Sequence, residues 1–340
     1  MDKVSLQFIA DKAGVSKSLV SKVLNNKEVR VSESTRTKIL EIADKYLYIP
    51  NRIAAGLRTC KTNMIGVIMP KLHTDFFASL VDAIEEEARS RGYDIILYNT
   101  QENPDLERRY LGLYKSGMMD GMLINPSDNE KNGPLYLSMI QDKYPFVFID
   151  RYIHNINAGF VTSDGYYGAN LLTNELIKRG HRKIYFLSHD KSRNTSVQIE
   201  RYEGYKDAII KRGLTPKRFY AEYEKPLEEQ RMFEILASPD RPTALCLVSS
   251  MDIYYILKLC QKLNYFIPKD IEIATFDRFS LEYSDHANME LARYINKPPI
   301  IIDQNADEIG KRAVKIVCNQ IENKDIEKAK IHLTPKLIGC

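Results

Sequence analysis

The sequence predicts an α/β protein built from a small three-helix head, with a helix-turn-helix, and a larger two-lobed body of parallel sheets covered by helices. Three observations support this prediction. Apolar residues recur at helical spacing in the first 49 residues, short apolar runs alternate with amphipathic segments from residue 64 onward, and the excess positive charge lies in the first fifth. A chain of 340 residues is long enough for more than one hydrophobic core.

The head begins with two short segments of helical periodicity. The first carries its apolar residues at Leu6, Ile9, Ala10 and Ala13, and the second at Leu19, Val20, Val23 and Leu24. Gly14 between them suits a tight turn because glycine adopts positive φ without steric cost, and Ser16 suits the N-cap of the second helix. Two short helices joined by such a turn form a helix-turn-helix. A third helix is expected from Ser32, with its core residues at Ile39, Leu40, Ile42, Ala43 and Leu47.

The charge of the chain is divided unevenly. Residues 1–61 hold 12 Lys+Arg and 6 Asp+Glu, whereas the other 279 residues hold 37 and 39, although the whole chain carries only +4. A basic head on a nearly neutral body is typical of proteins that bind nucleic acid. A basic face exposed to solvent would give the same charge count, so the charge alone leaves both interpretations open.

The second helix of a helix-turn-helix places its N-terminal residues in the major groove of DNA. Lysine donates to guanine O6 and N7, and serine or asparagine reaches base edges or phosphates. The DNA-binding residues predicted here are Ser16, Lys17, Ser18, Ser21, Lys22 and Asn25. The alternative is a solvated polar face, but the turn, the helix and the charge excess together favour DNA binding.

The head resembles the headpiece of the lac/galactose repressor family of bacterial transcription regulators in two stretches, "VSLQFIADKAGVSKSLVSKVLNN" and "VSESTRTKILEIADKYLYIPNRIAAGL". The likeness continues through the chain to the C-terminal "LTPKLI". The resemblance implies a DNA-binding head over residues 1–49, a hinge helix or linker over 50–61, and an effector-binding and dimerisation body over 62–340. It also implies operator DNA, a small-molecule effector and a second copy of the chain as partners.

The stretch "PNRIAAGLRTCKT" connects the head to the body. Pro50 ends the preceding segment and Asn51 suits the N-cap of a short helix, which is too short to be stable alone in water. By the family resemblance this helix lies in the minor groove, where Leu57 wedges between base pairs with Arg52 and Arg58 near phosphates. Apolar wedges of this kind kink DNA. A plain flexible linker is the alternative.

The body shows strand-like apolar runs separated by helical segments. The runs are 64–70, 93–99, 121–126, 145–150, 183–188, 244–249 and 272–277, and the helical segments include 76–92, 105–116, 165–179 and 200–212. Strand-helix alternation with nearly continuous apolar strands predicts parallel sheets covered on both faces. The length suits two lobes of similar construction, expected at about 62–161 with 293–323, and at about 162–292 with 324–340.

Polar and aromatic residues follow the predicted strands, where ligands bind in such sheets. They provide aromatic faces, carboxylates, guanidinium groups and amides, which is the mixture that a sugar requires. The body resembles the effector domain of the same family and the periplasmic sugar-binding proteins. That resemblance assigns effector contacts to Thr74, Phe76, Phe77, Asn125, Asp150, Arg151, Arg201, Asp252, Asp277 and Gln304.

Each of these residues also has a structural interpretation: Asp277 as a helix cap, Arg151 as the ion-pair partner of Asp150, and Phe76 and Phe77 as ordinary core. Thr74 and Met251 stand where the ribose-type binding proteins have asparagine, which argues against ribose as the effector. Asp252 beside Met251 offers a replacement polar contact.

Several classes of function are disfavoured by the sequence. It lacks G-x-S-x-G, H-E-x-x-H, G-x-G-x-x-G and Walker-type motifs, so we expect no enzyme activity and no cofactor. Its six histidines and five scattered cysteines show no metal-ligand spacing, and unpaired cysteines suit a reducing cytoplasm. No signal peptide is expected at the N-terminus, and no apolar run approaches the roughly 18 residues of a membrane span.

These observations predict a cytoplasmic, homodimeric transcription repressor that reads a pseudo-palindromic operator and responds to a small sugar or sugar derivative. Two alternatives stay open at this point. One is a carbon-catabolite-type regulator controlled by a phosphoprotein partner, and the other is a sugar-binding protein without a role on DNA.

Overall fold

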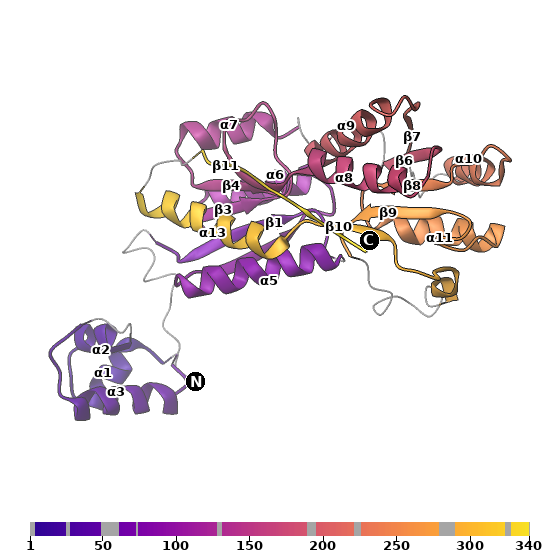
Figure 1. Cartoon of the computed structure of the whole chain (residues 1–340). Coiled ribbons are helices and arrows are strands. Elements are labelled where there is room, and N and C mark those ends of the chain that lie inside the picture. Colours follow the sequence, from indigo (N-terminus) through magenta and orange to yellow (C-terminus); the bar gives the residue numbers. More distant parts are fainter. Residues whose placement is uncertain are drawn as a thin grey trace. The chain divides into compact units, whose positions relative to one another are not determined.

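The computed structural model describes residues 4–24, 28–48, 61–72, 74–127, 131–188, 195–220, 226–278, 290–323 and 328–339. The chain divides into two compact units, residues 1–62 and residues 63–340. Both units appear in Figure 1. None of the helices within the described ranges is long and apolar enough to cross a membrane.

The first unit consists of α1 (Leu6–Ala13), α2 (Lys17–Leu24) and α3 (Glu33–Lys45). As predicted, Gly14 ends α1 with φ at +74°, and its N–H donates to the Ala10 carbonyl. The Ser16 hydroxyl accepts from the Leu19 N–H at 3.2 Å and so caps α2, while Ser32 caps α3. The turn and caps that define a helix-turn-helix are therefore present.

The core of the head differs from the prediction at two positions of the third helix. Ile39 and Ala43 are buried and Ile42 packs against them, but Leu40 is 45% exposed and Leu47 is 83% exposed. Leu40 lies on the outer face of α3, and Leu47 lies beyond the end of this helix with φ at +48°. The prediction that these two leucines help to form the core is wrong, and Tyr48 packs there instead.

The body contains two six-stranded sheets. The first has the order β11-β5-β4-β3-β1-β2, and all its strands are parallel. Its strands are β1 (Met64–Met69), β2 (Asp94–Asn99), β3 (Gly121–Ile124), β4 (Phe146–Ile149), β5 (Gly159–Ser163) and β11 (Lys330–Leu333). The covering helices are α5 (Asp75–Ser90), α6 (Pro104–Lys115), α7 (Gly133–Gln141) and α13 (Ala306–Asn323).

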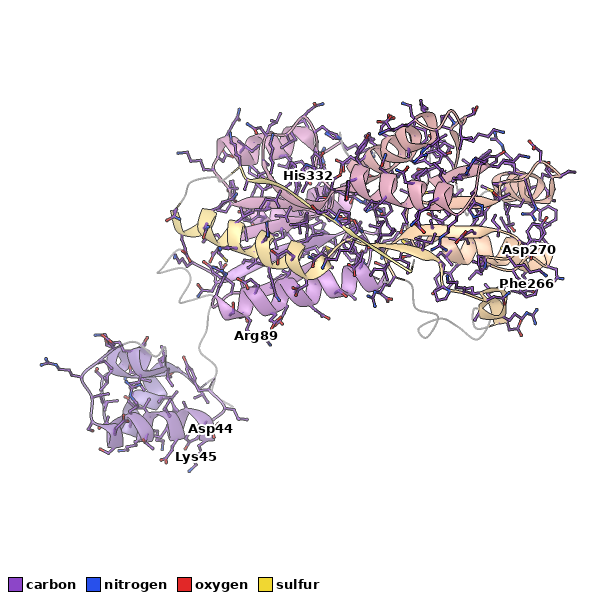
Figure 2. All side chains as sticks on the ribbon, viewed as in Figure 1. Asp44, Lys45, Arg89, Phe266, Asp270 and His332 are labelled. Atoms are coloured by element: carbon purple, nitrogen blue, oxygen red, sulfur yellow. The ribbon has the colours of Figure 1, made fainter. Side chains whose placement is uncertain are left out.

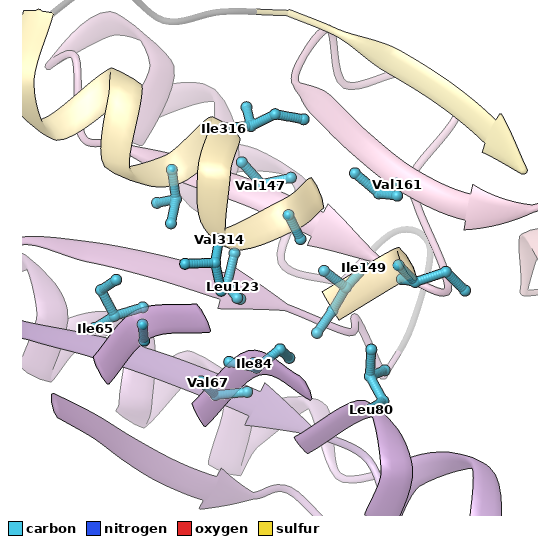
Figure 3. Close-up of a cluster of buried hydrophobic side chains, with 14 of the residues drawn as sticks. Ile65, Val67, Leu80, Ile84, Leu123, Val147, Ile149, Val161, Val314 and Ile316 are labelled. Atoms are coloured by element: carbon cyan, nitrogen blue, oxygen red, sulfur yellow. The ribbon is translucent and has the colours of Figure 1, made fainter. Parts of the chain in front are cut away.

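Helices cover both faces of the first sheet. One face packs against α5 and α13, which lie side by side (Figure 1). Figure 3 shows this cluster, in which Leu80 and Ile84 of α5 and Val314 of α13 meet apolar side chains of β1, β3, β4 and β5. The opposite face packs against α6 and α7. The strands are apolar on both faces because both faces are buried.

The second sheet repeats this design in the order β12-β10-β9-β8-β6-β7, with only β12 antiparallel to its neighbour. Its strands are β6 (Ile184–Ser188), β7 (Lys217–Tyr220), β8 (Ala244–Leu247), β9 (Glu272–Phe276), β10 (Ile300–Asp303) and β12 (Lys336–Ile338). Around it lie α8 (Gly165–Lys178), α9 (Ser196–Ile210), α10 (Pro226–Ala237), α11 (Asp252–Leu263) and the short 3-10 helix η1 (Ala292–Tyr294). One face packs against α8 and α9, and the other against α10, α11 and η1.

The chain passes from one sheet to the other three times, between β5 and α8, between β10 and α13, and between β11 and β12. We call the first sheet with its helices the first lobe, and the second sheet with its helices the second lobe. The expected lobe limits differ from this arrangement in the C-terminal part. β10 falls in the range expected for the first lobe but belongs to the second sheet, and β11 shows the reverse.

Candidate functional site

The exposed face of α2 carries the residues predicted to bind DNA. Val20 and Val23 of this helix are buried against α1 and α3. The opposite face presents Ser16, Lys17, Ser18 and Lys22 as exposed residues and Ser21 as a half-buried one. The Ser16 hydroxyl is already engaged as the cap of α2, so its predicted role combines with a structural one. Asn25, Arg52, Leu57 and Arg58 lie outside the described residues.

In the body, polar side chains gather at the carboxyl ends of strands from both sheets. Arg201 of α9 is the centre of this cluster and is only 4% exposed. Its Nη1 donates to the Val248 carbonyl just after β8 at 2.6 Å, and its Nη2 donates to Gln304 Oε1 just after β10 at 2.6 Å. The guanidinium also lies 3.8 Å from the centre of the Phe276 ring, at the end of β9. One side chain thus joins three strand ends of the second sheet.

Arg201 can reach these strands because α9 approaches α8 very closely. At Gly204, one turn after Arg201, an added Cβ would lie 2.1 Å from the Tyr166 carbonyl oxygen of α8. No residue other than glycine fits this crossing without moving the backbone. The glycine therefore fixes how deeply α9 sits on the sheet.

Two buried aspartates face Arg201, one from each sheet. Asp277 follows β9 and accepts from Gln304 Nε2, 2.8 Å from each carboxylate oxygen. Burial raises the pKa of Asp277 to about 7, although Arg201 and the Gln304 hydrogen bond act in the opposite direction. Asp150 follows β4 and accepts from Asn125 Nδ2 at 2.9 Å. Burial raises the pKa of Asp150 as well, while Arg151, Arg201 and the hydrogen bond from Asn125 lower it.

Arg151 has a partner that the sequence analysis missed. Its guanidinium donates twice to Glu102, at 2.9 and 3.1 Å, and both side chains are nearly buried. The hydrogen bonds of Arg151 therefore go to Glu102 and not to Asp150, the partner that its structural interpretation named. Glu102 follows the strand 94–99 in a left-handed conformation with φ at +59°. The available signal was its position just after a predicted strand, at the same sheet edge as the other site residues.

The remaining predicted residues lie on helix starts. Thr74 caps α5 by accepting from the Phe77 N–H at 3.2 Å. Phe76 and Phe77, with ring centroids 5.4 Å apart, belong to the buried cluster beneath α5, as their structural interpretation expects. Asp252 is fully buried in the first turn of α11. These four residues occupy helix starts that follow β1 and β8, whereas the other six predicted residues form one connected polar cluster, which we call the effector cluster: Asn125, Asp150, Arg151, Arg201, Asp277 and Gln304.

The effector cluster retains unused hydrogen-bonding capacity. Asn125 Oδ1, Arg151 Nε and Arg201 Nε are buried without a hydrogen-bond partner. Native structures rarely leave buried polar atoms unsatisfied outside functional sites. No group of three or more potential metal ligands exists among the described residues.

Comparison with known proteins gives a consistent result for both units. Residues 5–51 match the profile described as bacterial regulatory proteins, lacI family. Residues 62–230 match the profile for periplasmic binding proteins and the sugar binding domain of the LacI family, and residues 173–339 match that for a periplasmic binding protein-like domain. The chain belongs to the lacI family. This confirms the family resemblance seen in the sequence.

Relatives of this lacI-family chain include a probable transcriptional regulator EndR from Paenibacillus polymyxa, 27% identical over 94% of this chain and 92% of the relative. The transcriptional repressor PurR of Mannheimia succiniciproducens is 27% identical over 98% of this chain and 97% of its own. The lac repressor dimer bound to operator and the anti-inducer ONPF has a TM-score of 0.80 at 19% identity, and covers 99% of this chain and 98% of its own. A complex of the regulator CelR with cellobiose has a TM-score of 0.67 at 19% identity, with the same coverage.

These findings confirm the predicted fold, a helix-turn-helix head followed by two mainly parallel α/β sheets. The relatives are transcriptional regulators, which agrees with the prediction that the chain is not an enzyme.

Proposed function

We propose that this lacI-family DNA-binding transcription regulator is a cytoplasmic, homodimeric repressor whose affinity for a pseudo-palindromic operator is controlled by a small sugar or sugar derivative. The observation that carries the proposal is the effector cluster around Arg201, at the carboxyl ends of strands from both sheets. A ligand there contacts both lobes, so its binding changes the balance between their relative orientations.

The chemistry of the effector cluster suits a polyhydroxylated ligand. Hydroxyl groups donate to carboxylates such as Asp150 and Asp277, and they accept from guanidinium groups and amides. The same hydroxyls also match the unsatisfied atoms Asn125 Oδ1 and Arg201 Nε. A purely apolar ligand would leave Asn125 Oδ1 and Arg201 Nε buried without a hydrogen bond, at a cost of ~1–3 kcal/mol for each group.

The head supplies the other half of the proposal. The lysines of α2 are exposed on the face opposite the buried valines, where a recognition helix contacts the major groove. The test begins by selecting bound fragments from genomic DNA with the full chain and measuring affinity for the selected site by fluorescence anisotropy. Lys17→Ala and Lys22→Ala are each expected to weaken binding by ~1–3 kcal/mol, and to relax base preference where the lysine reads a base.

Lys178→Ala is the matched control, because it removes the same charge from an exposed lysine of the body. Wild-type operator affinity in both head variants would contradict the assignment of α2 as the recognition helix.

The effector is tested separately by calorimetry with D-glucose, D-galactose, D-ribose and cellobiose. Binding of one sugar, with a changed operator affinity, would support the proposal. If none of these sugars binds, and operator affinity instead responds to a phosphorylated carrier protein, the chain is a partner-controlled regulator of the carbon-catabolite type.

A further inference from the structure

Tyr152 makes two hydrogen bonds from the first lobe to the second. Its hydroxyl donates to Glu200 Oε1 at 2.5 Å, and its backbone N–H donates to the Ser196 hydroxyl at 3.1 Å. Ser196 and Glu200 lie one turn apart on α9, so both bonds reach the same face of this helix. Tyr152 itself lies in the segment between β4 and β5 of the first sheet. The contact therefore joins the two lobes by hydrogen bonds, in addition to the three chain crossings.

The ring of Tyr152 is held in place by the first lobe. It stacks on Phe160 of β5 with centroids 4.1 Å apart and planes 8° from parallel. His332 of β11 meets the Phe160 ring edge-on at 5.0 Å, and His154 meets the Tyr152 ring at 4.8 Å. Figure 2 shows His332 where the two lobes adjoin. Since these contacts fix the ring, the hydroxyl reaches toward α9 without a large loss of side-chain freedom.

Glu200 is held from the side of the second lobe. Burial raises the pKa of Glu200, and the hydrogen bond from Tyr152 and the nearby His332, Arg201 and His154 oppose this increase. An added Cβ at Gly165, the first residue of α8, would lie 3.1 Å from Glu200 Oε2. The carboxylate therefore packs against the point where the chain first crosses between the sheets.

The two partners of this contact adjoin the effector cluster in the sequence. Tyr152 directly follows Asp150 and Arg151, and Glu200 directly precedes Arg201. A shift of either lobe relative to the other changes the hydroxyl–carboxylate distance and the geometry of the effector cluster together. The contact thus depends on the same lobe arrangement as the site.

We infer that Tyr152 is a positioning residue, whose hydrogen bonds to Glu200 and Ser196 hold the two lobes in the arrangement that binds the effector. This inference rests on the proposed function for its effect on ligand binding, but the contact between the lobes can be tested without any ligand.

The test compares the full-length wild type with Tyr152→Phe, which keeps the ring stack and removes only the hydroxyl. In hydrogen exchange without added sugar, amides of residues 151–156 and 195–201 are expected to exchange ~10-fold faster, the effect of losing one hydrogen bond to a charged group. Tyr166→Phe is the matched control, because its hydroxyl donates to Asp207 at 2.7 Å entirely within the second lobe. The Tyr166→Phe variant is expected to leave the exchange rates of the amides of residues 151–156 at their wild-type values.

The second measurement uses whichever sugar of the calorimetric panel binds the wild type. Tyr152→Phe is expected to weaken sugar binding by ~10-fold, and Tyr166→Phe to leave it unchanged. The double variant Tyr152→Phe/Glu200→Gln is expected to bind the sugar no more weakly than whichever of its two single variants has the lower affinity. If no sugar binds the wild type, the proposed effector fails while the exchange experiment still decides the role of Tyr152. Wild-type exchange at residues 151–156 in Tyr152→Phe would overturn the inference, as would an equal loss of sugar affinity in Tyr166→Phe.

Discussion

The two lobes carry the same dipeptide at corresponding places and use it differently. Asp150–Arg151 follows β4 and Asp277–Arg278 follows β9, which are the third strands in the order of their sheets. Both aspartates adopt left-handed φ values, +60° and +67°, and both carboxylates face Arg201. The arginines differ. Arg151 is nearly buried against Glu102, whereas Arg278 is 68% exposed and lies 4.0 Å from Asp303.

This difference shows that a strand end determines the position of a side chain but not its environment. The first lobe places Glu102 beside its arginine at a buried edge, so the pair is desolvated and depends on mutual compensation. The second lobe leaves its arginine in water, where an ion pair contributes little. Of the two dipeptides, only the first therefore contributes both its residues to the effector cluster.

The largest expected effect comes from Arg201, which faces a buried aspartate of each lobe. Arg201→Ala leaves Asp150 and Asp277 without their common cation and removes the stack on Phe276, so it should destabilise the body by ~5 kcal/mol and abolish the response to effector. Urea unfolding and operator binding with and without sugar test this. Operator affinity without sugar should stay near the wild-type value. Arg212→Ala, an exposed arginine close behind the end of α9, is the control, and a normal sugar response in Arg201→Ala would refute the assigned site.

A second pair of variants tests the contrast between the two dipeptides directly. Arg151→Met leaves Glu102 buried without its bidentate partner and should cost ~3 kcal/mol of unfolding free energy. Arg278→Met should cost less than ~1 kcal/mol because its ion pair is exposed. Urea denaturation of both variants measures the difference. Equal losses would mean that burial does not distinguish the two arginines.

The last prediction concerns the pH dependence of stability. Burial raises the pKa of Asp277 to about 7 in the folded protein, whereas the unfolded chain releases the proton near the ordinary pKa of 3.8. The contribution of this carboxyl to the free energy of unfolding is therefore complete below pH 4, and it is lost as the pH rises to about 7. Asp277→Asn removes this loss, so its unfolding free energy should gain up to ~4 kcal/mol relative to the wild type between pH 4 and 8.

Urea unfolding at several pH values measures this gain, with the exposed Asp307→Asn as a control for the amide substitution. Parallel pH profiles for Asp277→Asn and the wild type would show that the Asp277 carboxyl does not titrate in this range.

The sequence predicted the fold well where periodicity and turn chemistry are strong. The caps at Ser16 and Ser32 and the turn at Gly14 follow from local rules that tertiary packing did not override. The strands β5 (GFVTS) and β7 (KRFY) were not predicted, because polar residues interrupt their apolar runs. Leu47 was misjudged because helical periodicity does not determine where a helix ends, and Leu40 because an apolar residue of a helix need not face the core.

The polar site was predictable only in part. Asp150, Asp277 and Gln304 follow recognisable strands, so their meeting at one edge is a consequence of parallel topology. The partnership of Glu102 depends on which loops of the first lobe lie together, and the role of Tyr152 depends on which loop faces α9 across the lobes. Contacts between residues far apart in the sequence are determined by tertiary structure. Glu102 and Arg151, for example, are 49 positions apart and form a hydrogen bond.

The last passage of the chain between the lobes has a consequence for synthesis. β11 and β12 are separated by two residues and supply one edge strand to each sheet. Until residues 330–338 have left the ribosome, β5 and β10 both present unpaired strand edges, which are ready to pair with another chain. A polypeptide released before residue 330 would therefore leave both lobes unfinished and prone to aggregate, although its DNA-binding head was made first. Both sheets are thus completed only when residues 330–338 are in place.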